Sequence, residues 1–337
     1  MAWFLSWLVG LASARSRPRM GSARRSRVPR PASRPLHVEA LEERALLSAD
    51  LLSPALGLGG PVVSDVALVQ GASGSQAESF TFTNVDAPGA TAGFASGINP
   101  AGDIVGRYTD ANGVTHGYLL SHGASTTIDF PGGIFTTARA INPAGDIVGE
   151  YRSADGVQHG YLLSRGVFTS LDFPGSPSTG ALGINARGDI VGAYITSDGR
   201  EHGFVLSEGQ YTSVDLPGSL LTNVLGINAA GDLVGRYITP DGVNHGYLLS
   251  EGTLTTIDPP GSVFTSARAI NDRGDVAGEY RTADGARHGF VLSRGVYTTV
   301  DFPGALTSDL FGINSSGDMV GRYTLGGTTH AFLVSRK

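Results

Sequence analysis

The sequence predicts an all-β fold, a six-bladed β-propeller of four-stranded blades, over residues 80–337. Three observations predict it. The dipeptide Ile-Asn recurs every 43 residues, six units of that length fill this range, and each unit holds four short strand-like runs between turn residues. Four strands in a repeat of this length are typical of a propeller. An open β-solenoid is the alternative, although solenoids usually have shorter repeats and distinct capping units.

Two further markers accompany the repeat. The motif Asp-x-Pro-Gly begins every 43 residues, at Asp86, Asp129, Asp172, Asp215, Asp258 and Asp301. A histidine keeps this step through five units and comes one residue earlier in the sixth, at His116, His159, His202, His245, His288 and His330. Because these residues recur around the ring, we interpret them as structural. We expect each histidine to hydrogen-bond within its blade, to the aspartate of the neighbouring outer strand.

The second unit shows the expected strands, at residues 136–142, 146–151, 159–164 and 168–173. A Pro-Ala-Gly turn joins the first pair, and a loop with Asp-Gly, a strong hairpin signal, joins the second and third runs. A small residue, Gly or Ala, precedes Ile-Asn in every unit, which suits a crowded inner strand. The fourth run ends in Asp-x-Pro-Gly, and proline, which lacks an N–H, suits an outer edge.

The order of the runs also predicts how the ring closes. The repeats begin with a run of the fourth type at residues 79–86 and end with a run of the third type at residues 330–335. The simplest closure lets residues 80–86 supply the outer strand of the last blade. This N-terminal strand would remove the free sheet edges of an open array.

The segment before the repeats predicts targeting. Within residues 1–36, an apolar run at 2–14 ends in a small-residue pattern like a signal-peptidase site. The run is short for a membrane span, which needs about 20 apolar residues. Eight arginines and no acidic residue follow the apolar run within residues 1–36. Basic residues at this place oppose translocation of the segment that follows. Met20, followed by a basic segment, is an alternative start, and both interpretations stay open.

Residues 37–52 predict a short amphipathic helix, and residues 53–79 predict a flexible linker because they are rich in Gly, Ala and Ser. The stretch LEERALL, Leu41 to Leu47, resembles the LEPR-XLL segment near the N-terminus of many large exported or surface proteins of bacteria. Glu43 stands where that family usually has proline. The resemblance implies sorting toward the cell envelope.

The repeat resembles a second family. THAFLV, Thr329 to Val334, together with GINSSGDMVGRY, Gly312 to Tyr323, is similar to the HAF repeat of extracellular bacterial proteins. The other five units have Gly-Tyr or Gly-Phe in place of Ala-Phe. The resemblance covers residues 80–337 and implies an exported repeat protein without a general catalytic activity.

Composition excludes several classes of function. Cysteine is absent, so the chain has no disulfide, no thiolate metal site and no cysteine nucleophile. Residues 80–337 hold 15 Lys and Arg against 24 Asp and Glu, and an acidic body repels nucleic acid. We expect no cofactor, no nucleic-acid partner and no stable transmembrane span. A monomeric propeller is the expected state.

The histidines do not predict a metal site. Zinc needs three or four ligands within about 2.1 Å of one ion. Third strands lie about 10 Å from the inner strands, so six equivalent histidines around a ring cannot converge. The Asn-x-x-Gly-Asp turns lack the ligand density of a calcium loop and are interpreted as hairpin turns held by side-chain-to-backbone bonds. No catalytic or nucleotide-binding motif stands in a suitable context.

Positions that differ between units are the candidates for ligand binding. In the second and fifth units, the residue two positions before Ile-Asn is Arg, and the residue after Val-Gly (Ala-Gly in the fifth unit) is Glu. These two units stand opposite each other in a six-membered ring. These units agree at 28 of 41 positions, which indicates duplication of a three-blade block. Arg139, Glu150, Arg268 and Glu279 are predicted to line the axial mouth. The alternative is a structural Arg–Glu pair between adjacent strands or blades.

The resulting hypothesis is an exported or cell-surface protein that acts as a binding or scaffold module without catalysis. Its candidate partners are a glycan or another surface protein. The alternative is an enzyme acting on glycans or peptides at the axial mouth, which three or more unequal carboxylates, histidines or arginines within about 5 Å would favour. A purely structural surface repeat, the third class, predicts no pocket.

Overall fold

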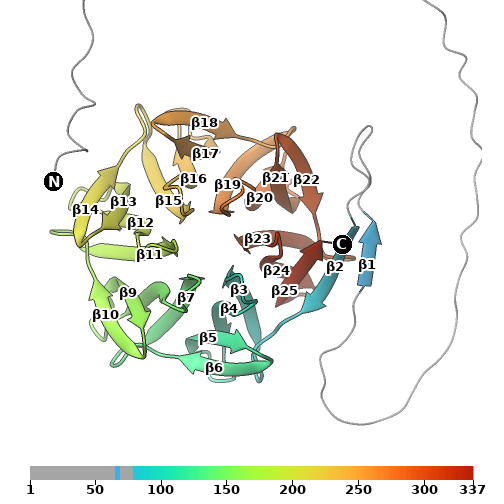
Figure 1. Ribbon diagram of the computed structural model, residues 1–337, viewed down its shortest axis with the longest axis horizontal. Helices are drawn as coiled ribbons and strands as arrows, with labels where there is room; N and C mark the ends of the chain where they lie inside the picture. Colours follow the sequence, from blue (N-terminus) through green and yellow to red (C-terminus); the bar gives the residue numbers. More distant parts are fainter. Residues whose placement is uncertain (1–64, 69–78, 337) are drawn as a thin grey trace, which may run out of the picture. The chain divides into compact units, whose positions relative to one another are not determined.

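The computed structural model describes residues 65–68 and 79–336, which form an all-β fold (Figure 1). Antiparallel strands stand in sets of four around a central axis, which confirms the predicted all-β class and the four-stranded sheets of a propeller. The segments predicted at residues 1–36 and 37–52 lie outside the described residues, as does most of the linker predicted at 53–79.

Six sets of strands, called blades 1 to 6, follow one another along the chain. Their inner strands are β3 (Ala92–Ile98), β7 (Phe135–Ile141), β11 (Ser178–Ile184), β15 (Leu221–Ile227), β19 (Ser262–Ile270) and β23 (Thr307–Ile313). Their second strands are β4 (Ile104–Thr109), β8 (Ile147–Arg152), β12 (Ile190–Ile195), β16 (Leu233–Ile238), β20 (Val276–Thr282) and β24 (Met319–Leu325). The inner strands surround the axis in Figure 1.

The two outer positions complete each blade. The third strands are β5 (Thr115–Ser121), β9 (Gln158–Ser164), β13 (Glu201–Ser207), β17 (Asn244–Ser250), β21 (Arg287–Ser293) and β25 (Thr328–Arg336). The fourth strands are β6 (Ala124–Ile128), β10 (Val167–Leu171), β14 (Gln210–Val214), β18 (Thr253–Ile257), β22 (Val296–Val300) and β2 (Ser79–Asn84). The bounds in blade 2 differ by only one or two residues from the expected runs.

Blade 6 takes its outer strand from the N-terminal side of the repeats, as the closure argument expects. β2 pairs antiparallel with β25, and Phe80 and Phe82 are fully buried against Phe332. A further strand, β1 (Asp65–Leu68), pairs with the free side of β2. The sequence predicts a linker without packed structure over 53–79, but β1 lies inside that range. A run as short as β1 is recognisable as a strand only beside its partner.

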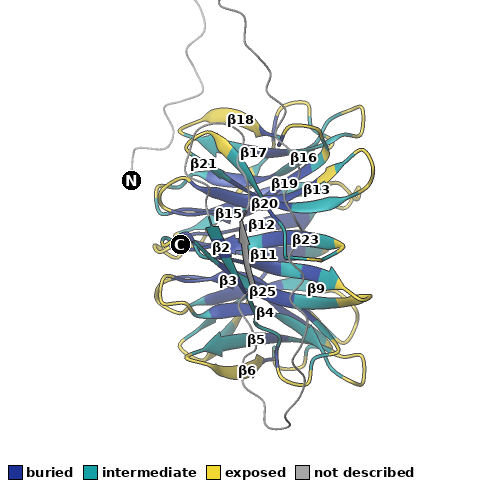
Figure 2. Ribbon diagram, turned by 90° about the vertical axis from the view of Figure 1, so that its right-hand side faces the viewer, coloured by how far each residue is buried: buried dark blue, intermediate teal, exposed yellow. Residues whose placement is uncertain are grey.

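Within each blade, a glycine on the second strand makes room for an aromatic ring on the third strand. A Cβ on Gly149 would overlap with the carbonyl oxygen of Thr137 and would lie 2.8 Å from a ring atom of Tyr161. Tyr161 is fully buried, and its counterparts in the other blades are also buried. The middle of each sheet is therefore buried, whereas the loops at both faces are exposed (Figure 2).

The asparagine of each Ile-Asn pair holds a hairpin turn and joins neighbouring blades. In blade 3, Asn185 Oδ1 accepts hydrogen bonds from the backbone N–H groups of Arg187 and Asp189, both at 3.0 Å. Its Nδ2 donates to Asp189 Oδ2 at 2.9 Å and to the carbonyl of Asn228 in blade 4 at 3.1 Å. The first interactions fix the turn, and the last links two blades close to the axis.

The same interblade bond closes the ring. Asn314 of blade 6 donates from Nδ2 to the carbonyl of Asn99 in blade 1 at 3.3 Å. All six of these asparagines are buried. They form an asparagine belt, defined as Asn99, Asn142, Asn185, Asn228, Asn271 and Asn314.

Candidate functional site

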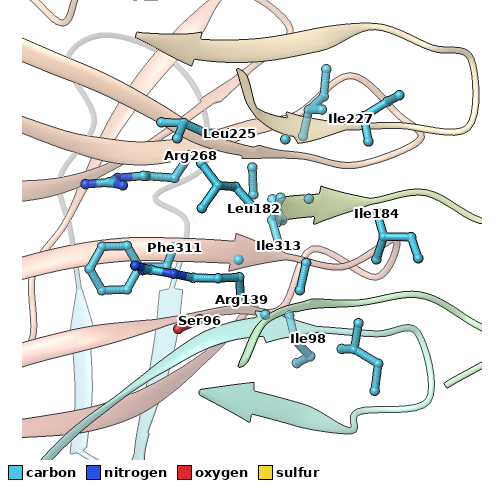
Figure 3. Close-up of a pocket in the computed structure, with 18 residues that line it drawn as sticks. Ser96, Ile98, Arg139, Leu182, Ile184, Leu225, Ile227, Arg268, Phe311 and Ile313 are labelled. Atoms are coloured by element: carbon cyan, nitrogen blue, oxygen red, sulfur yellow. The ribbon is translucent and has the colours of Figure 1, made fainter. Parts of the chain in front are cut away.

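A narrow cavity of about 80 Å³ lies on the axis between the six inner strands. Three successive residues of each inner strand line it. One end of the cavity is a ring of isoleucines, and glycine or alanine forms its middle. The asparagine belt follows the isoleucines directly in the sequence. The other end, called the variable mouth, is formed by Ser96, Arg139, Leu182, Leu225, Arg268 and Phe311. Figure 3 shows Arg139, Arg268 and Phe311 together on the side away from Ile98, Ile184 and Ile227.

A β-bulge directs the residues of the variable mouth toward the axis. The pairing of β7 with β8 shifts between Ala138 and Ala140, so Arg139 lies in the bulge. The same shift occurs at the equivalent place in all six blades. A bulge bends the strand and re-aims a side chain that regular pairing would place against the neighbouring sheet.

Arg139 and Glu150 form an ion pair in blade 2. Arg139 donates from Nε and Nη2 to Glu150 Oε2 at 2.9 and 2.6 Å. Gln158 donates to the other oxygen, Oε1, at 3.2 Å. Glu150 lies against blade 3, where a Cβ on Gly180 would overlap with Oε1. The structure therefore brings the predicted pair together across adjacent strands, with the carboxylate buried and the arginine partly exposed at the mouth.

Arg268 and Glu279 form the equivalent pair in blade 5, within a larger network. Arg268 donates to Glu279 Oε1 from Nε at 3.1 Å and from Nη2, and Arg287 donates to Oε2 at 2.6 Å. Arg287 also reaches Asp309 Oδ2 at 3.2 Å, and Arg322 donates to the same oxygen at 2.6 Å. Five unequal charged side chains therefore converge between blades 5 and 6, in contact with the mouth through Arg268.

Burial and repulsion separate the two carboxyls of this network. Burial and the neighbouring Glu279 carboxylate together raise the pKa of Asp309 to about 6. Burial acts on Glu279 in the same direction, but Arg268 and Arg287 hold the pKa of Glu279 below its usual range. Both groups are nearly inaccessible, with exposed fractions of 2% for Glu279 and 0% for Asp309.

Sequence reasoning missed Asp309, Arg287 and Phe94 as members of this region. Asp309 and Phe94 occupy the inner-strand position that pairs with the residue after Val-Gly. That position reads Phe94, Thr137, Gly180, Asn223, Ser266 and Asp309 along the chain. Its variability is the signal that would have found both residues.

The histidines lie far from the mouth, on the third strands. His159 Nδ1 hydrogen-bonds Asp172 Oδ1 at 2.7 Å, and the other five histidines contact the aspartate of their own blade in the same way. A tyrosine from the second strand stacks on each ring, such as Tyr151 on His159 at 5.0 Å between centroids. The structure thus pairs all twelve repeat residues within the blades and does not bring the histidines together. In the described part of the chain, no three His, Asp or Glu residues form a metal-binding group.

Comparisons with known proteins give structural similarity alone. No family model and no curated protein matches the chain. A fucose-binding-lectin complex from Aleuria aurantia is 12% identical, with a TM-score of 0.48 over 73% of this chain and 94% of that chain. TolB from Acinetobacter baumannii is 14% identical, with a TM-score of 0.49 over 68% and 63% of the two chains. The β-propeller domain of a Pyrococcus furiosus protease is 10% identical, with a TM-score of 0.46 over 73% and 97%.

The propeller assignment rests on the strand pairing of this chain itself.

Among residues 65–68 and 79–336, the structure contains no helix of the length and apolar character needed to cross a membrane.

Proposed function

We propose that the protein is an exported or cell-surface six-bladed β-propeller that acts as a binding or scaffold module and catalyses no reaction. One observation carries the binding function. Arg139 and Arg268 project into the axial cavity at a mouth whose six residues all come from one position of the repeat but differ in chemistry. A purely structural repeat would have no reason to place partly exposed cations around a cavity.

Each of the two arginines is held for binding by its carboxylate. Glu150 and Glu279 accept hydrogen bonds from the Nε and Nη2 groups. Within the described residues, Nη1 of neither arginine forms a hydrogen bond, so this edge of each guanidinium is proposed to contact a ligand. The Arg–Glu pair between adjacent strands is therefore compatible with a binding role, because it orients the donors in advance. A glycan or another surface protein is the proposed partner, and the propeller is proposed to be monomeric.

Export is proposed from the sequence alone. The HAF-like repeat over residues 80–337 and the LEPR-XLL-like stretch at residues 41–47 resemble segments of exported bacterial proteins. The acidic composition of residues 80–337 supports a partner other than nucleic acid.

One observation favours the enzyme as a second candidate. Glu279, Asp309 and three arginines converge between blades 5 and 6, beside the mouth, and two carboxyls whose pKa values are pushed apart are a known arrangement for acid–base catalysis. Access argues against it. The side chains of Glu279 and Asp309 are 3% and 1% exposed, and neither lines the axial cavity. A substrate could not reach them, so the binding function is preferred.

A glycan array with the full chain, run beside Arg139→Ala and Arg268→Ala, tests the proposal. We expect the wild type to bind a subset of glycans and both variants to lose that signal. Binding by none of the three proteins would contradict a glycan partner. Equal binding by all three would show that these arginines do not form the site.

A further inference from the structure

Around β3, at and beside the variable mouth, arginines outnumber carboxylates. Arg107 of β4, Arg139 of β7 and Arg322 of β24 lie around this strand. Glu150 pairs with Arg139, and Asp309 pairs with Arg322. Within the described residues, Arg107 has neither a hydrogen bond nor an ion pair through its guanidinium. The local charge is therefore positive although residues 80–337 as a whole are acidic.

The arginines share one aromatic ring. The guanidinium carbon of Arg107 lies 4.2 Å from the ring centroid of Phe94, and that of Arg322 lies 5.5 Å from the same centroid. Burial lowers the pKa of Arg107 to about 10, and repulsion by Arg139 and Arg322 contributes to the shift. Holding an unpaired cation in this position costs free energy, which an anion between the guanidinium groups would offset.

A buried hydroxyl provides a second, independent indication of a ligand. Ser96 of β3 is 6% exposed and lines the axial cavity. Its Oγ is buried without a hydrogen-bond partner among the described residues. Several other buried side-chain atoms of the described residues also lack a partner, but among the residues that line the cavity this is true of Ser96 alone. A buried polar atom of this kind calls for an explanation, such as a bound water or ion.

We propose that the variable mouth binds an oxyanion group, a carboxylate, sulfate or phosphate, between Arg107, Arg139 and Arg322, with the hydroxyl of Ser96 as a further donor. This proposal rests on the binding function proposed above and names the chemical class of its ligand. The axial cavity of about 80 Å³ has room for only a few waters, and Ser96 and Arg139 line it whereas Arg107 and Arg322 do not. The anionic group is therefore proposed to sit at the rim of the cavity, with the rest of the ligand outside.

The opposite half of the ring shows that the site occurs once. Three blades away, Leu225 replaces Ser96, and Ala193 replaces Arg322. Arg236 is the counterpart of Arg107, but its Nε donates to Asn223 Oδ1 at 2.8 Å. Asn223 in turn replaces Phe94. The Arg–Glu pair therefore occurs in both blades 2 and 5, whereas the unpaired positive charge is found around blade 1.

Isothermal titration calorimetry of the full chain tests the proposal. The probes are glucuronate, glucose 6-sulfate and inorganic phosphate, with glucose as the neutral control. We expect saturable binding of at least one anion, no binding of glucose, and weaker binding as salt rises. Arg107→Gln should weaken anion binding about tenfold or more, since one charge-assisted contact contributes about 1.5–3 kcal/mol. Arg236→Gln is the matched control and should bind like the wild type.

The outcomes separate this proposal from the broader one. A tenfold loss in Arg107→Gln alone supports the anion site, and the preferred probe identifies the carboxylate, sulfate or phosphate. Equal affinities in Arg107→Gln and Arg236→Gln, or equal binding of glucose, would overturn the anion site and leave the binding function standing. Absence of binding to every anion would also overturn it, and the glycan array would then decide the binding function separately.

Discussion

The two ends of the axial cavity are built from neighbouring residues of the same strands but differ in chemistry. At one end, isoleucine and the asparagine belt are the same in all six blades. At the other end, the variable mouth contains serine, arginine, leucine and phenylalanine, and its neighbours on the second strands include arginine, glutamate and alanine. Only one residue of each inner strand, a glycine or alanine, separates the mouth residue from the isoleucine at the other end.

The difference shows how a repeated chain divides stability from binding. The side chain of Asn185 donates to the backbone carbonyl of Asn228, so replacing such an asparagine breaks both the turn of its own blade and a link to the next blade. The side-chain hydrogen bonds of a bulge residue such as Arg139 stay within its own blade, so one copy can change without breaking a hydrogen bond to another blade. We therefore expect substitutions at uniform positions to affect stability without changing binding, and substitutions at the mouth to affect binding, with a cost in stability only where the residue pairs with a buried group, as Arg268 does with Glu279.

The largest effect should follow from a uniform glycine. A Cβ at Gly192 of β12 would overlap with the carbonyl oxygen of Gly180 and would lie 2.8 Å from Cε1 of the buried Phe204. Because backbone and a fully buried ring cannot both move, Gly192→Ala should lower the free energy of unfolding by about 3 kcal/mol or more. Denaturant unfolding of the purified protein measures the loss, or insoluble expression reports it if folding fails.

Gly199→Ala in the same blade is the control for that change. Gly199 lies in a turn with φ of 81°, and a Cβ there would meet no atom within 4 Å. Only the left-handed backbone conformation opposes alanine, which costs about 1–2 kcal/mol. Equal losses in both variants would show that the close contact of Gly192 with Gly180 and Phe204 does not determine the packing of the blade.

The asparagine belt should give the next largest effect. Asn185→Ala removes two acceptor bonds of the turn, the bond to Asp189 and the bond to blade 4, and leaves buried groups without partners. We expect a loss of about 2–3 kcal/mol in unfolding free energy and no change in ligand binding at the opposite mouth. Arg187→Ala, at an exposed side chain of the same turn, should cost less than about 0.5 kcal/mol. Weakened binding in Asn185→Ala with an intact fold would contradict the division between the two ends.

The sequence predicts most of the uniform part because periodicity exposes it. The four strands of blade 2, the closing strand at residues 80–86 and the scaffold place of His159 all follow from spacing and turn residues. β1 could not be foreseen, since it has no counterpart in the repeat and its only partner is the edge of β2.

The mouth was harder to predict because its contacts cross between blades. Comparing units identified Arg139, Glu150, Arg268 and Glu279, since they vary at two positions of the repeat. The same comparison did not show that Glu279 meets Asp309 through Arg287, because those contacts depend on how blade 5 faces blade 6. Nor does a strand pattern reveal the bulge that turns Arg139 toward the axis.

The buried carboxyl pair gives a third test, through pH. Asp309 faces Glu279, Arg287 and Arg322, and its raised pKa means that the folded state binds more protons than the unfolded state between about pH 4 and 6. Stability contributed by protonated Asp309 is therefore present below pH 4 and lost as pH rises through 6. Relative to Asp309→Asn, the wild type should lose about 1–2 kcal/mol of unfolding free energy between pH 4 and 7.

Glu279 acts in the opposite sense, because its lowered pKa makes its contribution disappear as pH falls. It is present in both proteins, so the difference between them reports Asp309 together with its interaction with Glu279. Chemical denaturation at a series of pH values measures that difference. Parallel stability curves for the wild type and Asp309→Asn would mean that Asp309 is charged throughout, and that the network between blades 5 and 6 is an ordinary set of ion pairs.

The smallest effect on stability is expected at Arg107, and it separates a binding arginine from a structural one. Replacement by glutamine removes the contact with Phe94 but also relieves burial of the charge and repulsion by Arg139 and Arg322, so the two changes oppose each other. The free energy of unfolding should stay within about 0.5 kcal/mol of the wild type. Arg268→Gln, which breaks a pair with the buried Glu279, should cost about 1–3 kcal/mol. Thermal and denaturant unfolding compare the two variants. A loss of unfolding free energy above about 1 kcal/mol in Arg107→Gln would show that Arg107 is a structural residue. The contrast between the two ends of the cavity would then not hold.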